Sequence, residues 1–192
     1  MVKTAMIKEE LEIPEGVEVI LGGNHHITVK GPNGKITKDF SHIRGIKVSI
    51  EDNKIIFASH FPKSETVALV KTVYNIIKNL IIGVQTNYKY VCKICYSHFP
   101  CNVEVKSDKK EIHVVNFLGE RAPRVTNILD NVEVSVEKDD VILIGPDKEA
   151  LGQTAANLKR CCRIRKKDPR VFQDGVYLYK IQLQDEILWQ IK

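Results

Sequence analysis

Residues 47–59 read KVSIEDNKIIFAS, and residues 133–145 read EVSVEKDDVILIG. In both segments apolar and polar side chains alternate on either side of a short polar turn, which predicts a β-hairpin in each. The second segment follows the first at an offset of 86 residues. Alternation alone does not require identities such as Ser49 and Ser135, so we interpret the two hairpins as copies of one repeated unit.

The same offset relates an earlier pair of segments. Residues 13–19 read IPEGVEV, and residues 99–105 read FPCNVEV. In the first copy this segment pauses at a glycine pair and resumes as HITVKG at residues 26–31, which predicts a further hairpin. The turn GPNG follows at residues 31–34.

Each copy then runs through a proline, Pro62 or Pro146, into a helical period. In the first copy the apolar face is formed by Val67, Val70, Val73, Tyr74, Ile77, Leu80 and Ile81. In the second copy it is formed by Leu151, Thr154, Ala155, Leu158 and Cys162. We expect Ser64 and Asp147 to cap the starts of the two helices and Gly83 to end the first one.

These elements predict an α+β fold with two tandem repeated units, each a small antiparallel sheet packed against one helix. We expect the first unit in residues 1–82 and the second in residues 83–180. Residues 83–98 alternate and would add a strand to the second unit. The tail, residues 181–192, has the apolar side chains of a short helix, docked either on a neighbouring protein or on its own unit.

The composition bounds the class of protein. Of 192 residues, 43% are apolar and 28% are charged, a balance typical of an ordered protein. No apolar run approaches the roughly 20 residues needed to cross a bilayer, and the N-terminal residues lack the apolar core of a secretory signal. We therefore expect no membrane partner. Five cysteines without an export signal are expected to be reduced thiols in the cytoplasm.

No pattern indicates a catalytic or metal site. Cys92 and Cys95 lie three residues apart on an expected strand and would point to opposite faces, so we interpret the thiols as buried apolar side chains. His25 and His26 are expected in a solvent-exposed turn. Glycine-rich phosphate loops and hydrolase signatures are absent from the sequence. We predict that the protein is not an enzyme and uses no cofactor, metal or small-molecule substrate.

Positive charge is concentrated in the basic segment, KRCCRIRKKDPR at residues 159–170. Seven of its side chains are basic and one, Asp168, is acidic, whereas the whole chain has a net charge of only +5. The first two cations fall in the last helical turn, where they interact favourably with the helix dipole. The others either remain solvated or face an external polyanion, of which RNA is the commonest. Phe172 and Tyr177 follow and are placed to stack on an unpaired base.

Several motifs, taken in order, resemble one known family. They are IPEGVEV at residues 13–19, ITVKGPNGKITKDF at 27–40, NFLGE at 116–120, GPDKEALGQTAANLKR at 145–160 and KKDPRVFQDGVYLYK at 166–180. In these motifs the chain closely resembles the universal large-subunit ribosomal protein six family, numbered nine in eukaryotes. The resemblance implies a duplicated α+β unit, in agreement with the repeat. It also implies that Gly175 serves a tight turn and that Asp174 accepts a hydrogen bond.

The resemblance further implies a structural constituent of the large ribosomal subunit in the cytoplasm. Such a protein would bind large-subunit rRNA near the sarcin–ricin loop and the base of the factor-binding stalk, and would adjoin other ribosomal proteins. The residues expected to contact RNA are Arg160, Arg163, Arg165, Lys166, Lys167, Arg170, Phe172, Tyr177 and Lys180. The alternative is a non-ribosomal scaffold whose basic segment meets an acidic protein partner.

Two features depart from the family. Eukaryotic members carry a lysine-rich hairpin where this chain has the acidic turn Glu51-Asp52-Asn53, and a tryptophan-rich element where it has Ser59-His60-Phe61. These departures shift the expected RNA contact to the second unit.

Overall fold

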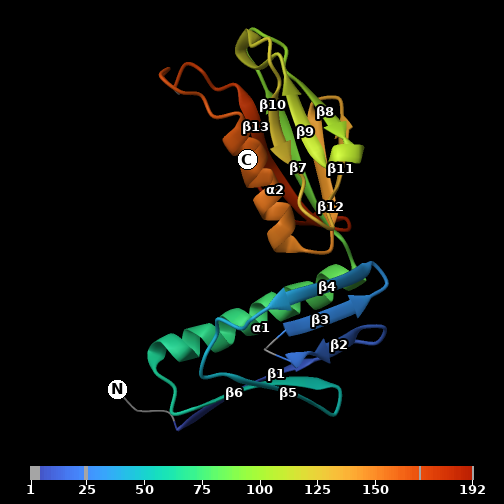
Figure 1. Cartoon of the computed structure of the whole chain (residues 1–192), viewed down its shortest axis with the longest axis vertical. Coiled ribbons are helices and arrows are strands. Elements are labelled where there is room, and N and C mark those ends of the chain that lie inside the picture. Colours follow the sequence, from blue (N-terminus) through green and yellow to red (C-terminus); the bar gives the residue numbers. More distant parts are fainter. Residues whose placement is uncertain (1–4, 24–25, 169, 192) are drawn as a thin grey trace. The chain divides into compact units, whose positions relative to one another are not determined.

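The computed structural model describes residues 5–23, 26–168 and 170–191. The chain divides into two compact units, Met1–Thr86 and Asn87–Lys192 (Figure 1). Within the described residues, each unit contains two antiparallel sheets and one α-helix.

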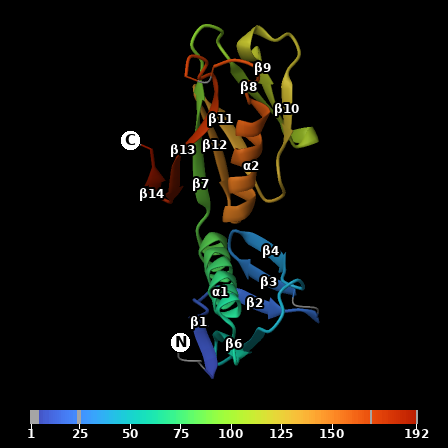
Figure 2. The same ribbon diagram turned by 90° about the vertical axis from the view of Figure 1, so that its left-hand side faces the viewer.

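The first unit places its helix against two three-stranded sheets. Its elements are β1 (Met6–Glu12), β2 (Glu18–Leu21), β3 (His26–Gly31), β4 (Gly34–Asp39), β5 (Lys47–Glu51), β6 (Lys54–His60) and α1 (Ser64–Gln85). One sheet has the order β1-β6-β5 and the other β2-β3-β4. The helix contacts β1 and β6 of one sheet and β3 and β4 of the other (Figure 2). The fully buried side chains Val29, Phe57, Val70 and Ile77 therefore share one core.

The second unit repeats this arrangement and extends it. Its elements are β7 (Tyr88–Cys95), β8 (Asn102–Lys106), β9 (Glu111–Val115), β10 (Arg124–Asn127), β11 (Glu133–Glu137), β12 (Asp140–Gly145), α2 (Lys148–Cys161), β13 (Gly175–Leu183) and β14 (Glu186–Gln190), with short 3-10 turns at Ser107–Lys109 and Phe117–Gly119. Its sheets have the orders β11-β12-β7-β13-β14 and β10-β9-β8. The helix α2 contacts β7, β12 and β13 of one sheet and β10 of the other.

The internal repeat predicted from the sequence is confirmed. Strands β11 and β12 begin 86 residues after β5 and β6, and the order β11-β12-β7 repeats the order β5-β6-β1. The α+β fold in two tandem units is confirmed as well, and the strand expected within residues 83–98 is present as β7, the counterpart of β1. Each unit has two sheets rather than one, because alternation identifies strands but does not identify their partners.

The two helix starts differ in how well they were predicted. Asp147 caps α2, since its side chain accepts the N–H of Glu149 at 2.9 Å. The prediction for Ser64 is wrong: Ser64 is already helical, and the residue before it, Lys63, makes no side-chain capping bond.

The end of α1 is set by a distant turn rather than by Gly83. Asn33, in the β3–β4 turn, donates its N–H to the Val84 carbonyl and its Nδ2 to the Gln85 carbonyl, both at 3.0 Å. A Cβ atom on Gly31 would lie 2.7 Å from the Val84 side chain, so the turn approaches the helix closely only because this residue is glycine. The helix continues to Gln85 because its last carbonyls find partners there.

The expectation about apolar runs needs correction at α1. By length and composition alone, this 22-residue helix is long and apolar enough to cross a membrane. The run was missed because Lys71 and Lys78 interrupt it. In this unit one face of α1 belongs to the core, and both lysines lie on the exposed face. We therefore interpret α1 as the core helix of the first unit.

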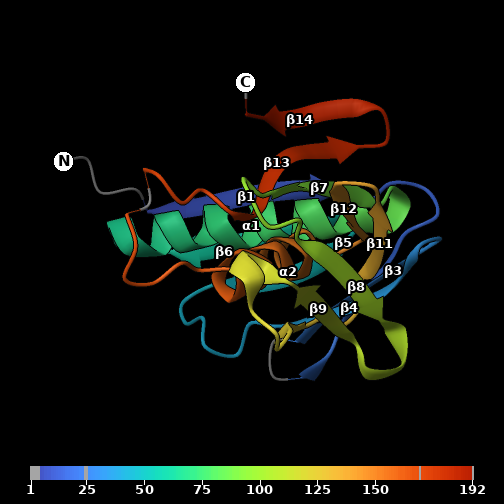
Figure 3. The ribbon, with the colours of Figure 1, turned by 90° about the horizontal axis from the view of Figure 1, so that it is seen from above.

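The tail is a strand, so the prediction of a short helix is wrong. β14 pairs antiparallel with β13, as Figure 3 shows, and the N–H of Ile191 donates to the Tyr179 carbonyl at 2.9 Å. Gln184 adopts a left-handed conformation (φ 52°) in the turn that reverses the chain. The side chains of Ile187 and Trp189 remain exposed on this strand.

The cysteines contribute to the core of the second unit. Cys92, Cys101 and Cys162 are buried, and burial raises the pKa of the Cys92 and Cys162 thiols from 9.0 to about 12. Among the described residues, no group of three or more histidine, cysteine or acidic side chains is placed to hold a metal ion. The prediction of buried, apolar thiols is therefore confirmed for these three cysteines and is wrong for Cys95, which is partly exposed at the end of β7.

Replacing Leu158 with Asp should unfold the second unit. Leu158 is fully buried on α2, and an unpaired buried carboxylate costs on the order of several kcal/mol. We expect the circular dichroism melt to lose part of its amplitude, and the fluorescence anisotropy of Trp189, the single tryptophan, to fall. Gln153→Asp, on the exposed face of α2, is the control and should melt like the wild type. An unchanged melt of Leu158→Asp would contradict this packing.

Thiol alkylation should distinguish the five cysteines. In the folded protein near neutral pH, we expect Cys95 and Cys161, which are partly exposed, to react before Cys92, Cys101 and Cys162. The Cys92 and Cys162 thiols stay protonated to about pH 12, whereas the unfolded thiols ionise near 9.0. Their stabilising contribution is therefore complete below pH 9.0 and is lost as the pH rises toward 12. Peptide mass spectrometry and denaturant unfolding measure both effects, and equal alkylation rates at all five thiols would refute the assignment.

Candidate nucleic-acid interface

The basic segment, residues 159–170, begins on the last turn of α2 and continues as a loop toward β13. Asp168 organises the end of this loop, because its Oδ1 accepts the N–H of Arg170 at 3.0 Å and its carbonyl accepts the N–H of Phe172 at 3.0 Å. The carboxylate also binds the guanidinium of Arg170, with 2.9 Å between Oδ2 and Nη2. The single acid of the segment is therefore occupied by one of its seven cations.

Asp174 and Gly175 join the loop to β13. The Asp174 side chain is buried, and its Oδ1 accepts the N–H of Ser97 at 3.0 Å, which confirms the expected acceptor role. Gly175 has a φ of 155° and lies against the Tyr177 ring. The hydroxyl of Tyr177 donates to the Asp174 carbonyl at 3.3 Å. These contacts fix the point at which the loop becomes a strand.

Arg124, at the start of β10, bridges the end of α2 to a separate loop. Its Nη1 donates to the carbonyl oxygens of Cys161 and Arg163, both at 3.0 Å. Its Nε and Nη2 donate to the two carboxylate oxygens of Glu120 at 2.8 and 2.6 Å, and its guanidinium lies 4.3 Å above the Phe117 ring. The hydrogen bonds from Arg124 lower the pKa of Glu120, so the pair is charged at neutral pH. We call these contacts the Arg124 bridge.

The loop that supplies Glu120 is itself tightly built. Asn116 and Leu118 both adopt left-handed conformations, with φ of 57° and 53°, and Asn116 donates its Nδ2 to the Pro100 carbonyl at 2.9 Å. Phe117, between them, is 1% exposed. Residues 116–120 therefore form a structured loop, which provides a rigid base for the Arg124 bridge.

Most cations of the basic segment are exposed and lack a carboxylate partner. Within the described part of the chain, no ion pair involves Arg160, Arg163, Arg165 or Lys166, and all four are exposed. The remaining two lysines lie over aromatic rings: the Lys159 Nζ is 5.7 Å from the Tyr177 ring centre and the Lys167 Nζ is 4.4 Å from the Phe172 ring centre. The segment therefore presents positive charge and aromatic surface together.

Two hollows flank the basic segment. The larger one, about 980 Å³, lies between the segment and the start of β13, and its lining includes Tyr96, Phe172 and Tyr177. The smaller one, about 520 Å³, lies toward the Arg124 bridge. It is lined by Leu118, Glu120, Arg124, Arg160, Cys161, Arg163, Ile164, Arg165 and Lys167. Both hollows are lined by cations, and only the larger one also has aromatic side chains, so we call the larger one the aromatic hollow and the smaller one the cationic hollow.

The structure brings together most, but not all, of the residues predicted from the sequence. Six of them line one or both hollows: Arg160, Arg163, Arg165, Lys167, Phe172 and Tyr177. Lys166 and Arg170 are exposed on the same segment but line neither hollow. Lys180 lies further along β13, paired with Val91 and Gln190. It is part of the sheet and lies apart from the hollows.

Sequence reasoning missed Arg124. Its spacing of four residues from Glu120 signals only a local ion pair. The two hydrogen bonds that hold the basic segment join Arg124 to the carbonyls of Cys161 and Arg163, which follow it by 37 and 39 positions. Such a contact leaves no trace in one sequence.

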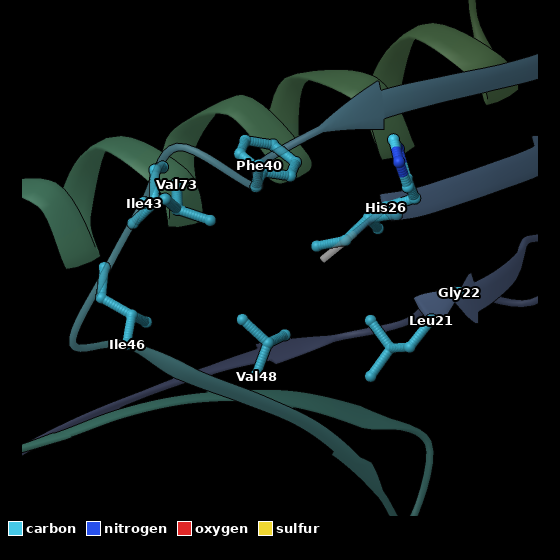
Figure 4. A pocket seen from close by; sticks show the side chains of 9 residues that line it. Leu21, Gly22, His26, Phe40, Ile43, Ile46, Val48 and Val73 are labelled. Carbon is cyan, nitrogen blue, oxygen red and sulfur yellow. The ribbon is translucent and has the colours of Figure 1, made fainter. Parts of the chain in front are cut away.

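A separate hollow in the first unit, about 350 Å³, brings together no comparable chemistry (Figure 4). Its lining includes the apolar side chains Leu21, Phe40, Ile46 and Val73, and His26 is the one ionisable residue among the described ones. The turn expected at His25-His26 lies partly outside the described residues; His26 is the first residue of β3 and is exposed. The Nδ1 of His26 lies 3.8 Å from the Asp39 carboxylate, and both side chains are exposed, so this pair is a surface contact beside the hollow rather than a catalytic arrangement.

Arg124→Lys should loosen the basic segment while retaining the charge. One ammonium group cannot make the four bonds of the planar guanidinium, and hydrogen bonds to charged groups contribute roughly 1.5–3 kcal/mol. We expect faster amide hydrogen exchange at residues 162–168 and a lower melting temperature. Arg121→Lys, at an exposed arginine of the same loop, is the matched control. Unaltered exchange in Arg124→Lys would show that the bridge does not hold the segment.

Comparison with known proteins agrees with this architecture. The family model described as "Ribosomal protein L6" matches residues 13–87 and 99–175, one stretch in each unit. The large ribosomal subunit protein uL6 of Aeropyrum pernix is 43% identical over 180 residues, covering 94% of this chain and 97% of the relative. The uL6 proteins of Methanobrevibacter smithii and Saccharolobus solfataricus are 42% and 40% identical, covering 93% and 91% of this chain and 98% and 95% of their own lengths. The chain therefore belongs to the ribosomal protein L6 family.

Proposed function

We propose that this protein is a structural, non-catalytic constituent of the large ribosomal subunit that binds large-subunit rRNA through the basic segment. The observation that carries the proposal is the group of exposed cations without carboxylate partners, held on a rigid base. Membership of a family whose relatives are named as large ribosomal subunit proteins supports the same function.

The charge pattern favours a polyanion over solvent as the partner of the segment. Arg160, Arg163 and Arg165 lie within six residues of one another, and their mutual repulsion costs free energy that closely spaced phosphates would offset. Arginine suits this role because its planar fork matches two phosphate oxygens. Lys159 and Lys167 lie over rings, a contact worth about 0.5–1 kcal/mol at exposed sites. Because that contact is weak, the two ammonium groups can leave the aromatic rings and bind phosphates instead.

The second unit carries the proposed rRNA contact, near the sarcin–ricin loop and the base of the factor-binding stalk, as the family resemblance implies. The acidic turn Glu51-Asp52-Asn53 between β5 and β6 makes the corresponding hairpin of the first unit a poor RNA ligand. Exposed Ile187 and Trp189 on β14 are proposed to face a neighbouring ribosomal protein. The place of action is the large ribosomal subunit in the cytoplasm.

Changing Arg163, Arg165 and Lys167 together to Glu should abolish binding to large-subunit rRNA fragments. If four to six cations of the wild type neutralise phosphates, the logarithm of the association constant should fall against that of the salt concentration with a slope of about −4 to −5. The melting temperature should not fall, because all three side chains are exposed. Filter binding over a salt series and a thermal melt measure both quantities.

The matched control is the triple variant Lys106, Lys109 and Lys138 to Glu, which changes the charge equally on exposed positions of the same unit. This control should keep most of the affinity for the rRNA fragments and most of the slope of the association constant against salt. The tagged wild type should sediment with large subunits in low and high salt. Flat salt dependence, or equal loss of binding in both triple variants, would contradict a contact through the basic segment and would favour an acidic protein partner.

A further inference from the structure

We propose that the two hollows beside the basic segment divide the parts of one unpaired nucleotide between them: the aromatic hollow receives its base, and the cationic hollow receives the adjacent phosphate. This inference rests on the proposed function and names the part of an RNA that the segment takes. A contact made by cations to a regular duplex would need neither hollow, because phosphates lie on the outside of the helix.

The larger hollow has the surface that a base requires. Phe172 lies in the link between the segment and β13, Tyr177 lies in β13 itself, and Tyr96, which follows β7, is exposed beside them. Its volume of about 980 Å³ is ample for one base, since pockets for small organic molecules measure roughly 300–1,000 Å³. Aromatic rings bind unpaired bases by stacking, and the contact tolerates any base because each has a π face.

The smaller hollow has the charge that a phosphate requires. Arg160, Arg163 and Arg165 line it without a carboxylate partner among the described residues. Its one carboxylate, Glu120, is already held by Arg124 through two hydrogen bonds. The hollow therefore has unneutralised guanidinium groups, which bind phosphate oxygens in pairs.

The two hollows share a wall, and this determines on which side of it the base and the phosphate of the nucleotide lie. Arg160, Arg163, Ile164 and Lys167 line both hollows. A base and its phosphate are joined through one sugar, so a single nucleotide that crosses this wall places its base on one side and its phosphate on the other. Only a bulged or looped nucleotide is free to do so, because a base-paired one remains stacked inside the duplex.

The test compares two short RNA hairpins, one with a single unpaired 2-aminopurine and one fully paired, using the full-length protein. The wild type should bind the bulged hairpin more tightly and change the fluorescence of the 2-aminopurine. Phe172→Leu should reduce that preference by about 5- to 150-fold, the range for loss of one base–aromatic stack, and lower the affinity for the paired hairpin far less. Phe172→Trp should retain the preference. Phe61→Leu, at a side chain 83% exposed in the first unit, is the control.

The outcomes separate this inference from the proposed function. Equal affinity for the two hairpins in the wild type and in Phe172→Leu would overturn the base site. Suppose that the wild type and Phe172→Leu show this equal affinity. If the Arg163, Arg165 and Lys167 triple variant then binds neither hairpin, RNA binding through the basic segment stands and only the division between the hollows fails. If the triple variant binds both hairpins like the wild type, both proposals fail. A thermal melt of Phe172→Leu that matches the wild type ensures that a lost preference is not a loss of folding.

Discussion

One guanidinium group holds the end of α2 in place, and the path of the basic segment depends on it. The carbonyls of Cys161 and Arg163 lie where the helix can no longer supply N–H partners, and Arg124 donates to both. Arg124 adds a positive charge to a region already crowded with cations, which by itself would raise the repulsion there. Its ion pair with Glu120 neutralises that charge locally, and its contact with the Phe117 ring fixes its orientation. The bridge therefore orders the segment without adding to its net charge.

A concentration of unpaired cations lowers stability, so the free energy of folding must come from elsewhere in the unit. Two unit charges about 4 Å apart in water repel by roughly 1 kcal/mol, and physiological salt screens them beyond about 8 Å. Burying one large aliphatic side chain contributes about 1.5–3 kcal/mol. Leu143, Leu151 and Leu158 are fully buried in the second unit, and a few such side chains outweigh the repulsion. Stability resides in the sheets and α2, whereas the charges reside on the surface.

The sequence predicted most of the features that depend on local patterns, although the cap expected at Ser64 was not among them. Alternation and the constant offset located the repeated hairpins, and Asp147 capped α2 as its position indicated, because a cap involves residues two or three apart. Prediction from the sequence failed where a distant contact decides the outcome. The helix α1 continues beyond Gly83 because Asn33, 52 positions before Gln85, donates to its last carbonyls. The tail failed for another reason, since a short apolar run fits a helix and a strand equally well. The aromatic and cationic hollows arise from three-dimensional packing, so only their residue types were predictable.

The carbonyls at the end of each unit's helix need hydrogen-bond donors from outside the helix, and the two units supply different donors. In each unit, carbonyls at or just beyond the helix end accept hydrogen bonds from one residue of a neighbouring three-stranded sheet, in the β3–β4 turn of the first unit and at the start of β10 in the second. The donor is the neutral Asn33 in the first unit and the cation Arg124 in the second. The last turn of α1 has no basic residue, and only two residues separate α1 from β7, whereas α2 ends in two cations and is followed by residues 162–174 before β13. The first unit has no room for a charged loop at this point. The proposed RNA contact thus belongs to the connection after the second helix, and the duplicated sheets and helices provide the rigid support that such a connection requires.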